Sequence, residues 1–152
     1  YPKYQEIWGV NGFKIYICGS YDLEFKLKKK IKSMKNLIFL GYVKNLNSLV
    51  SSCHGCLFPI DVPVGNRSRI VTALGSGWPI IAHKHTAIGN PALKNGYNCY
   101  LAKNENQFGL FSKMLYKKRK LNDTISKNAI KTYNSTFNPS QSLSKFEKFL
   151  NE

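Results

Sequence analysis

Acidic side chains are scarce in this sequence of 152 residues, which has 8 aspartates and glutamates against 23 lysines and arginines. Hydrolysis by paired carboxylates needs two acids in one cleft, and Asp61 is the one acid in the loops expected to form a cleft. The scarcity therefore argues against that chemistry. The formal net charge of +15 favours anionic partners such as nucleotides, phospholipid surfaces or nucleic acid. A compositional bias toward Lys and Asn is the alternative explanation of the charge.

Several standard motifs are also missing. The sequence has no G-x-G-x-x-G, no Walker A motif and no G-x-S-x-G elbow, so the usual dinucleotide, P-loop and α/β-hydrolase signatures give no support. No apolar run is long enough to span a bilayer, and no signal peptide opens the chain. The cytoplasm is the expected location, because the four cysteines form no disulfide framework. Because the chain starts mid-pattern at Tyr1, we also expect a fragment of a longer protein.

The four cysteines do not form a disulfide framework or a recognisable zinc motif. Cys18 lies in an apolar run and is expected to be buried. Cys53-His54-Gly55-Cys56 is a C-x-x-C sequence, but it lies between a helix end and a strand, whereas a redox pair normally opens a helix. Structural cysteines are the favoured interpretation, with metal and redox roles as alternatives.

Strand-like and helical patterns alternate along the chain, which predicts a parallel sheet covered by helices on both faces. Short apolar runs predict strands at Phe13–Cys18, Asn36–Leu40, Gly55–Ile60, Trp78–Ala82 and Asn98–Ala102. Helical spacing predicts helices at Leu23–Met34, Leu46–Cys53, Ser68–Leu74, Gln107–Tyr116, Asp123–Tyr133 and Pro139–Leu150, with Asp22 and Asp123 as caps. The fold class is α/β, a Rossmann-like doubly wound sheet ending in C-terminal helices. Residues 1–152 are expected to form one domain.

In such sheets, ligands bind beyond the carboxyl ends of the strands, and the loop at residues 64–69 has the strongest chemical signal there. Gly65 allows a ligand to approach the backbone, and Asn66 or Ser68 can cap the following helix. Arg67 and Arg69 add guanidinium groups suited to phosphate oxygens. The loop predicts a diphosphate site; an ordinary capped helix with two solvated arginines is the alternative.

Three other loops reach the same edge. Gly19-Ser20 and Gly41-Tyr42-Val43 are turns that can hold a nucleobase or simply connect a strand to a helix. In His83-Lys84-His85, a histidine can bind a ligand or exchange protons. The H-x-H sequence can also bind metal, but no third ligand is evident in the sequence, so no metal site is assigned. Solvated loop histidines are the alternative.

Two lysine-rich helical stretches, Lys26–Lys35 and Lys113–Lys120, have the composition of a surface for anionic lipid. Ordinary amphipathic helices with their apolar side in the core are the alternative. A membrane contact would place the protein at the inner face of the membrane.

The order of motifs resembles the C-terminal domain of group 1 glycosyltransferases of the GT-B fold, family 4-like, over nearly the whole chain from Phe13. The matching pieces are IYICG at 15–19, FLGYV at 39–43, CLFP at 56–59, the Gly65 loop, RIVTALGSGWPII at 69–81 and KNGYNCYL at 94–101. The resemblance implies donor-phosphate contacts from Arg69 and Gly65 and a base contact from Tyr42 and Val43. Thr72 lies where the family has a ribose-binding Glu, and Val64 lies where many members have the first Glu of an E-x7-E pair.

The resemblance implies transfer of a sugar from a nucleotide-diphosphate donor, the substrate, to a bacterial surface glycan or glycolipid, without a metal or cofactor. Asp61 and His83 are candidate sugar contacts. The N-terminal domain would supply acceptor contacts, so the fragment alone is expected to be inactive. Alternatives are a nucleotide-sugar epimerase of the same architecture, a nucleic-acid-binding module, which no RNA- or DNA-binding motif supports, and a non-catalytic relative.

Overall fold

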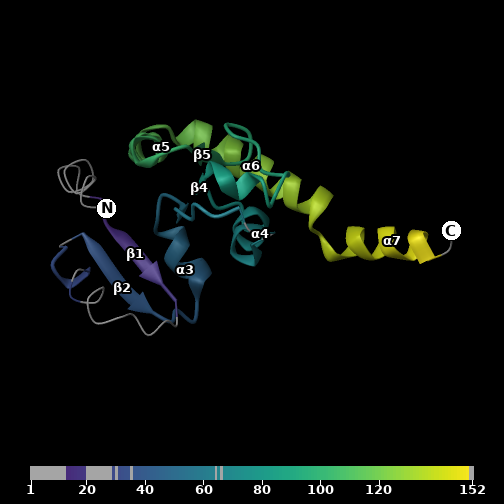
Figure 1. The fold of residues 1–152 in the computed structure, drawn as a ribbon, viewed down its shortest axis with the longest axis horizontal. Helices are drawn as coiled ribbons and strands as arrows, with labels where there is room; N and C mark the ends of the chain where they lie inside the picture. Colours follow the sequence, from purple (N-terminus) through teal and green to yellow (C-terminus); the bar gives the residue numbers. More distant parts are fainter. Residues whose placement is uncertain are drawn as a thin grey trace. The chain divides into compact units, whose positions relative to one another are not determined.

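The computed structural model describes residues 13–19, 29, 31–34, 36–63, 65 and 67–150. They belong to two compact units, Tyr1–Leu49 and Val50–Glu152, which are described separately below (Figure 1). The expectation of one domain over residues 1–152 stays a prediction.

The first unit contains two parallel strands, β1 (Ile15–Cys18) and β2 (Leu37–Gly41). Both lie within the predicted runs, apart from Gly41 at the end of β2. The β1 side chains alternate in burial, so Cys18 shares the exposed face with Tyr16. The prediction that Cys18 is buried is therefore wrong, because strand alternation outweighs an apolar run.

Most of the helix predicted at Leu23–Met34, including its cap Asp22, lies outside the described residues. Lys29, Ile31 and Lys32 within it are helical. Helix α3 (Leu46–Ser51) follows β2, and its start is capped by the Asn45 side chain, which accepts a hydrogen bond from the Ser48 N–H at 3.0 Å.

The second unit has a parallel sheet in the order β3-β4-β5, from strands β3 (Cys56–Phe58), β4 (Ile80–His83) and β5 (Tyr100–Ala102). All four residues of β4 are buried, as expected for a central parallel strand. The helices are α4 (Ser68–Gly75), the 3₁₀ helix η2 (Lys84–Ala87), α5 (Glu105–Lys117), α6 (Arg119–Thr136) and α7 (Pro139–Leu150). Parallel strands alternating with helices confirm the α/β class.

The core of this unit forms where α4 packs on the sheet and on α6. Ile70, Ala73 and Leu74 of α4 are fully buried with Ile80 and Ala82 of β4. The turn after α4 lies so close to α6 that side chains do not fit. A Cβ at Gly77 would lie 2.8 Å from the Ile130 Cδ1 atom, and its φ of +66° also favours glycine. This close approach explains the glycines in the sequence GSGWP.

Two helix starts differ from the sequence-based prediction. Helix α5 begins at Glu105, two residues early, because Asn104 caps it: its Oδ1 accepts from the Gln107 N–H at 3.1 Å, and Gln107 Oε1 accepts from the Lys103 N–H at 2.8 Å. Asp123 is not a cap but lies inside α6, which begins at Arg119. The buried Asn122 amide donates to the Leu115 carbonyl at 2.6 Å, and this bond holds the first turn of α6 against the end of α5.

The segment KNGYNCYL is fixed by one buried amide. Asn98 is fully buried; its Nδ2 donates to the Ala92 carbonyl and to Thr132 Oγ1, and its Oδ1 accepts from the Lys94 N–H, each at 2.8 Å. These bonds connect the loop before β5 to α6. Asn98 therefore has a structural role in this segment.

Replacing Asn98 by alanine is expected to lower the free energy of unfolding by at least the roughly 1–3 kcal/mol that one orphaned buried polar group costs. The loss arises because three partners lose their bonds inside the fold. Urea unfolding followed by circular dichroism measures it. Asn134→Ala, an exposed position on α6, is the control, and an equal effect in both variants would contradict the role of Asn98.

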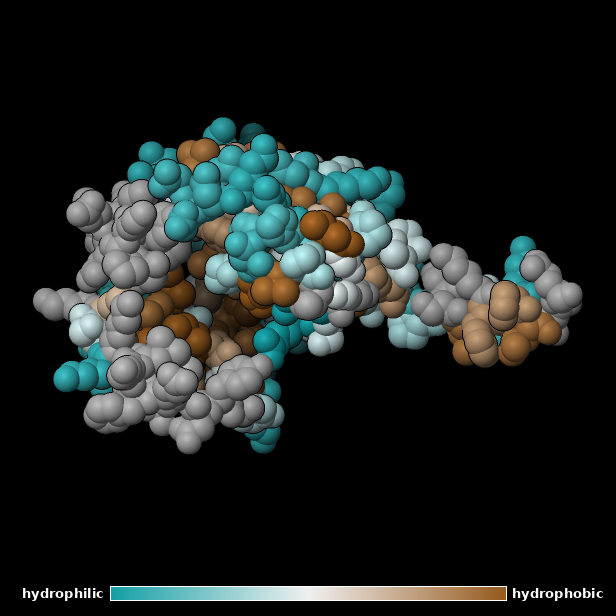
Figure 2. Space-filling view, in the orientation of Figure 1, coloured by the Kyte–Doolittle hydropathy of each residue, from teal (hydrophilic) through white to brown (hydrophobic). Residues whose placement is uncertain are grey.

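Helix α7 presents apolar side chains to solvent (Figure 2). Its exposed large residues are Leu143, Phe146, Phe149 and Leu150. Within the described part of the chain, no helix combines the length and apolar character needed to cross a membrane.

Candidate functional site

The carboxyl edge of the β3-β4-β5 sheet collects most of the predicted site residues of the second unit. Strands β3 and β4 run parallel with Phe58 opposite Ala82, so the segments that follow them leave the sheet at the same edge. The segment after β3 contains Asp61 and Gly65 and leads into α4. The segment after β4 begins at His83 and forms η2.

Helix α4 starts at this edge, and among the described residues no side chain caps it. Its N-cap is Arg67, in an extended conformation, and Ser68 is the first helical residue. The prediction that Ser68 caps the helix is therefore wrong, because the chain turns into the helix one residue earlier. Asn66, the other predicted cap, lies outside the described residues. A helix start without a side-chain cap is a favourable place for an anion, since first-turn N–H groups and the helix dipole face outward.

The Arg67 side chain folds back over the preceding loop. Its Nη2 donates to the Val62 carbonyl at 3.3 Å. Its Nε is buried, and among the described residues it has no hydrogen-bond partner. A buried guanidinium nitrogen without an acceptor is costly, and an anion at this helix start is one group that would supply the acceptor. Arg67 thus anchors the loop and keeps hydrogen-bonding capacity.

Arg69 and Thr72 lie three residues apart on α4, on its exposed face. Ser68 is exposed beside them, whereas Ile70, Ala73 and Leu74 are buried on the opposite face. The helix therefore presents a cation and two hydroxyl groups outward from its first two turns.

None of the described residues packs against Gly65. A Cβ atom built on it would have no neighbour within 4 Å, and its φ is not positive. Neither packing nor backbone conformation requires a glycine here. The backbone at Gly65 is therefore open to close approach by something outside the chain, and the ligand contact of this loop stays a prediction.

Asp61, His83 and His85 form a compact cluster. Asp61 Oδ1 lies 3.1 Å from His83 Nδ1 and 2.6 Å from His85 Nδ1. The two imidazole rings meet edge to face with centroids 4.7 Å apart. His83 is buried at 8% exposure, and its Nδ1 also accepts from the His85 backbone N–H at 3.4 Å. The structure thus brings the two candidate sugar contacts, Asp61 and His83, together. It adds His85, for which the sequence indicated only a place in the same loop as His83.

The predicted base-binding residues of the first unit lie around one turn. The Gly19 N–H donates to the Gly41 carbonyl at 2.8 Å, and Gly41 has a φ of +67°, which favours glycine. Tyr42 follows with 77% of its surface exposed, and Val43 is half-buried. Gly19, Tyr42 and Val43 are therefore neighbours, with an aromatic ring free to stack on a planar group. Ser20 lies outside the described residues.

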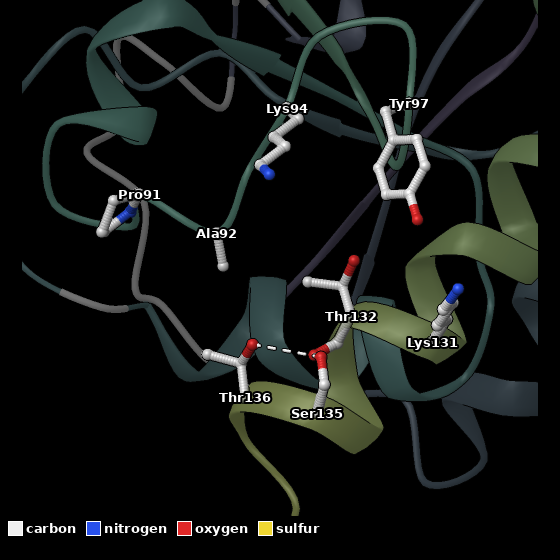
Figure 3. Close-up of a pocket in the computed structure, with 8 residues that line it drawn as sticks. All are labelled: Pro91, Ala92, Lys94, Tyr97, Lys131, Thr132, Ser135 and Thr136. Atoms are coloured by element: carbon white, nitrogen blue, oxygen red, sulfur yellow. Dashed lines mark hydrogen bonds between the residues drawn. The ribbon is translucent and has the colours of Figure 1, made fainter.

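A separate open pocket of about 450 Å³ lies between the loop before β5 and the C-terminal half of α6 (Figure 3). Its lining is Pro91, Ala92, Lys94, Tyr97, Lys131, Thr132, Ser135 and Thr136. None of the predicted site residues lines it, because they lie at the strand ends instead.

The cysteines of the second unit show no sign of a redox site. Burial raises the pKa of the Cys99 thiol to about 12, which makes it unreactive at neutral pH. Cys53 and Cys56 are half-buried thiols that form no disulfide bond. The structural interpretation is supported for Cys99 and stays a prediction for Cys53 and Cys56.

Solved structures share this fold. Over 97% of the chain, it matches Anabaena HepE in complex with UDP, with a TM-score of 0.78 and 18% identity, covering 44% of that protein. It matches TarM over 99% of the chain, with a TM-score of 0.76 and 16% identity, covering 32% of TarM. It also matches the C-terminal domain of the group 1 glycosyl transferase LpcC from Francisella tularensis over 88% of the chain and 92% of that domain, with a TM-score of 0.59 and 18% identity.

The chain spans less than half the length of HepE and TarM. No curated protein sequence matches it significantly. These structural likenesses establish one half of the GT-B fold. The family of group 1 glycosyl transferases matches residues 3–116, well over half of the sequence, and the chain therefore belongs to the group 1 glycosyl transferases.

Proposed function

We propose that the start of α4 binds the diphosphate of a nucleotide-sugar donor and that the protein transfers the sugar to an acceptor. The observation that carries the proposal is the start of α4 at the carboxyl edge of the sheet, where Arg67 is the N-cap and Gly65 and Arg69 are exposed on either side of it. HepE structures with UDP and with UDP-glucose, which share the fold, support a nucleotide sugar as the ligand.

Charge development explains how these groups would act. When the bond between the sugar and the diphosphate of the donor breaks, negative charge develops on the leaving nucleotide diphosphate. Fixed N–H groups and a guanidinium stabilise that charge without having to reorganise. Arg67 and Arg69 supply the positive charge that the leaving group needs, so the proposal requires no cofactor. The nucleotide sugar itself is a substrate.

The proposed ribose contact differs from that of the family. Tyr42 and Val43, beside Gly19, are proposed to hold the base. Thr72 is proposed to bond a ribose hydroxyl in place of the family's Glu, and a neutral hydroxyl makes a weaker bond than a carboxylate. Val64, at the other acidic position of the family, lies outside the described residues.

We further propose a hexosyl or related donor and a bacterial glycan or glycolipid as the acceptor, in polysaccharide biosynthesis. Acceptor contacts are assigned to an N-terminal domain of the same protein, and the chain alone is expected to be inactive. The proposed location is the cytoplasm, at the inner face of the membrane where the positive charge would favour anionic lipid.

The test is calorimetric titration of the full-length protein with UDP, ADP and GDP and with the matching nucleosides. At least one diphosphate is expected to bind ten or more times more tightly than its nucleoside, because each charge-assisted hydrogen bond contributes about 1.5–3 kcal/mol. Equal affinities for every diphosphate and its nucleoside would remove the phosphate assignment.

A further inference from the structure

We propose that Asp61, His83 and His85 form a binding site for a divalent transition-metal ion such as Zn²⁺. The proposed ligands include none of the donor-phosphate residues of α4, and the proposal does not depend on the proposed function. Among the described residues, these three side chains are the one group of this kind whose ligand atoms converge, and those atoms all lie within 4.8 Å of one another.

The two distances from Asp61 Oδ1 to the histidine nitrogens are somewhat shorter than the ligand spacing of a coordination sphere. Bonds of about 2.0–2.1 Å in a tetrahedral site place neighbouring ligand atoms about 3.3 Å apart. Asp61 Oδ1 and His83 Nδ1 are 3.1 Å apart, and Asp61 Oδ1 and His85 Nδ1 are 2.6 Å apart. The Asp61 side chain is 67% exposed, so it can rotate to open the shorter contact around an ion.

The hydrogen bonding around His83 also favours a cation. Its Nδ1 faces the His85 backbone N–H at 3.4 Å and the Asp61 carboxylate at 3.1 Å. One imidazole nitrogen cannot accept from the first and donate to the second at the same time. If it accepts from the His85 N–H, no proton lies between it and the carboxylate oxygen, and the 3.1 Å contact lacks a hydrogen bond. In that state, a metal ion between the two atoms would bond to both, at the expense of the longer contact to the N–H.

The fold explains why the ligands lie together and why the site stays open. His83 ends the buried strand β4, and η2 returns His85 to the same side two residues later. Asp61 follows the neighbouring strand β3. The His85 side chain is 36% exposed and Asp61 more so, so a bound ion keeps positions for water or another oxygen ligand. Two imidazoles and one carboxylate suit Zn²⁺, Fe²⁺ or Mn²⁺.

One rival site has to be separated in the test. Cys53, His54 and Cys56 lie close in sequence, and thiolates bind Zn²⁺ strongly. The chain has three histidines in all, so His54 is a matched control for His85. The His54 ring packs edge to face on Tyr116 with centroids 5.4 Å apart, and it does not belong to the converging group.

The experiment titrates ZnCl₂ into the metal-free, full-length protein without nucleotide and follows binding by calorimetry and the melting temperature. Asp61→Asn and His85→Ala are expected to weaken binding by more than the roughly 10–100-fold that loss of a supporting residue costs. His54→Ala and a Cys53→Ser/Cys56→Ser variant are expected to bind as the unchanged protein does. Co²⁺ should give a spectrum without thiolate charge transfer.

Unchanged Zn²⁺ affinity in both Asp61→Asn and His85→Ala would overturn the proposal. A loss of Zn²⁺ affinity confined to the cysteine variant would also overturn it. So would the absence of Zn²⁺ binding by the unsubstituted protein, because Asp61, His83 and His85 would then be a hydrogen-bonded cluster only. Circular dichroism spectra show whether each variant is folded. Nucleotide titrations in the presence of a chelator test the proposed function by itself, so the two proposals can fail separately.

Discussion

Replacing Arg69 by alanine is expected to weaken binding of the preferred nucleoside diphosphate by about 10–150-fold, with little change in melting temperature. The range corresponds to one charge-assisted hydrogen bond of roughly 1.5–3 kcal/mol. Arg69 is on the exposed face of α4, in its first turn, so its loss leaves the buried face of the helix intact. Isothermal titration calorimetry of the full-length protein measures the affinity.

The matched control for this substitution is Lys127→Ala. Lys127 is exposed on α6 and carries the same charge, so the control removes an equal part of the overall positive field. It is expected to change affinity less than about threefold, because exposed charges beyond roughly 10 Å are screened at 0.1 M salt. Equal losses in the two variants would show attraction by net charge alone and would contradict a contact from Arg69.

The Gly55→Ala substitution is expected to lower the free energy of unfolding by about 1–3 kcal/mol or more, the cost of overfilling a packed interior. An added Cβ would lie 2.6 Å from the Pro79 carbonyl oxygen and 2.8 Å from Leu115 Cδ1. The same Pro79 oxygen accepts from the Cys56 N–H at 2.8 Å, so it cannot move without weakening the start of the β3-β4 pairing. Chemical unfolding followed by circular dichroism measures the loss.

Gly65→Ala is the control, because the same methyl group there has no neighbour within 4 Å. Its unfolding free energy is expected to stay within about 0.5 kcal/mol of the unchanged protein, as is usual for surface positions. Its nucleotide affinity is expected to fall if a ligand approaches the loop backbone. A stability loss as large as that of Gly55→Ala would show that the Gly65 loop is packed rather than open.

The strands were the most predictable part of the fold. The runs around β3, β4 and β5 are apolar and bounded by glycine, and a strand buried on both faces needs such a run. Details that depend on tertiary partners were less accessible. The start of α6 depends on the Asn122 bond to the Leu115 carbonyl, and the exposure of Cys18 depends on which face of β1 is covered.

The site was predictable where one loop contains it and not where several loops meet. Gly65, Arg67 and Arg69 are close in sequence, so their shared position before and on α4 followed from the pattern. The contact of Asp61 with His83 and His85 joins residues more than 20 positions apart. It follows only once β3 is known to pair with β4 and η2 is known to return the chain. A carboxylate just after one strand and a histidine at the end of the next were the available signal.

The apolar surface of α7 has a consequence for the behaviour of the molecule in solution. Four large hydrophobic side chains on one short helix promote self-association, which the mutual repulsion of molecules with a formal charge of +15 opposes. Salt screens the repulsion and leaves the hydrophobic attraction in place. Colloidal stability of the chain should therefore be greatest at low ionic strength.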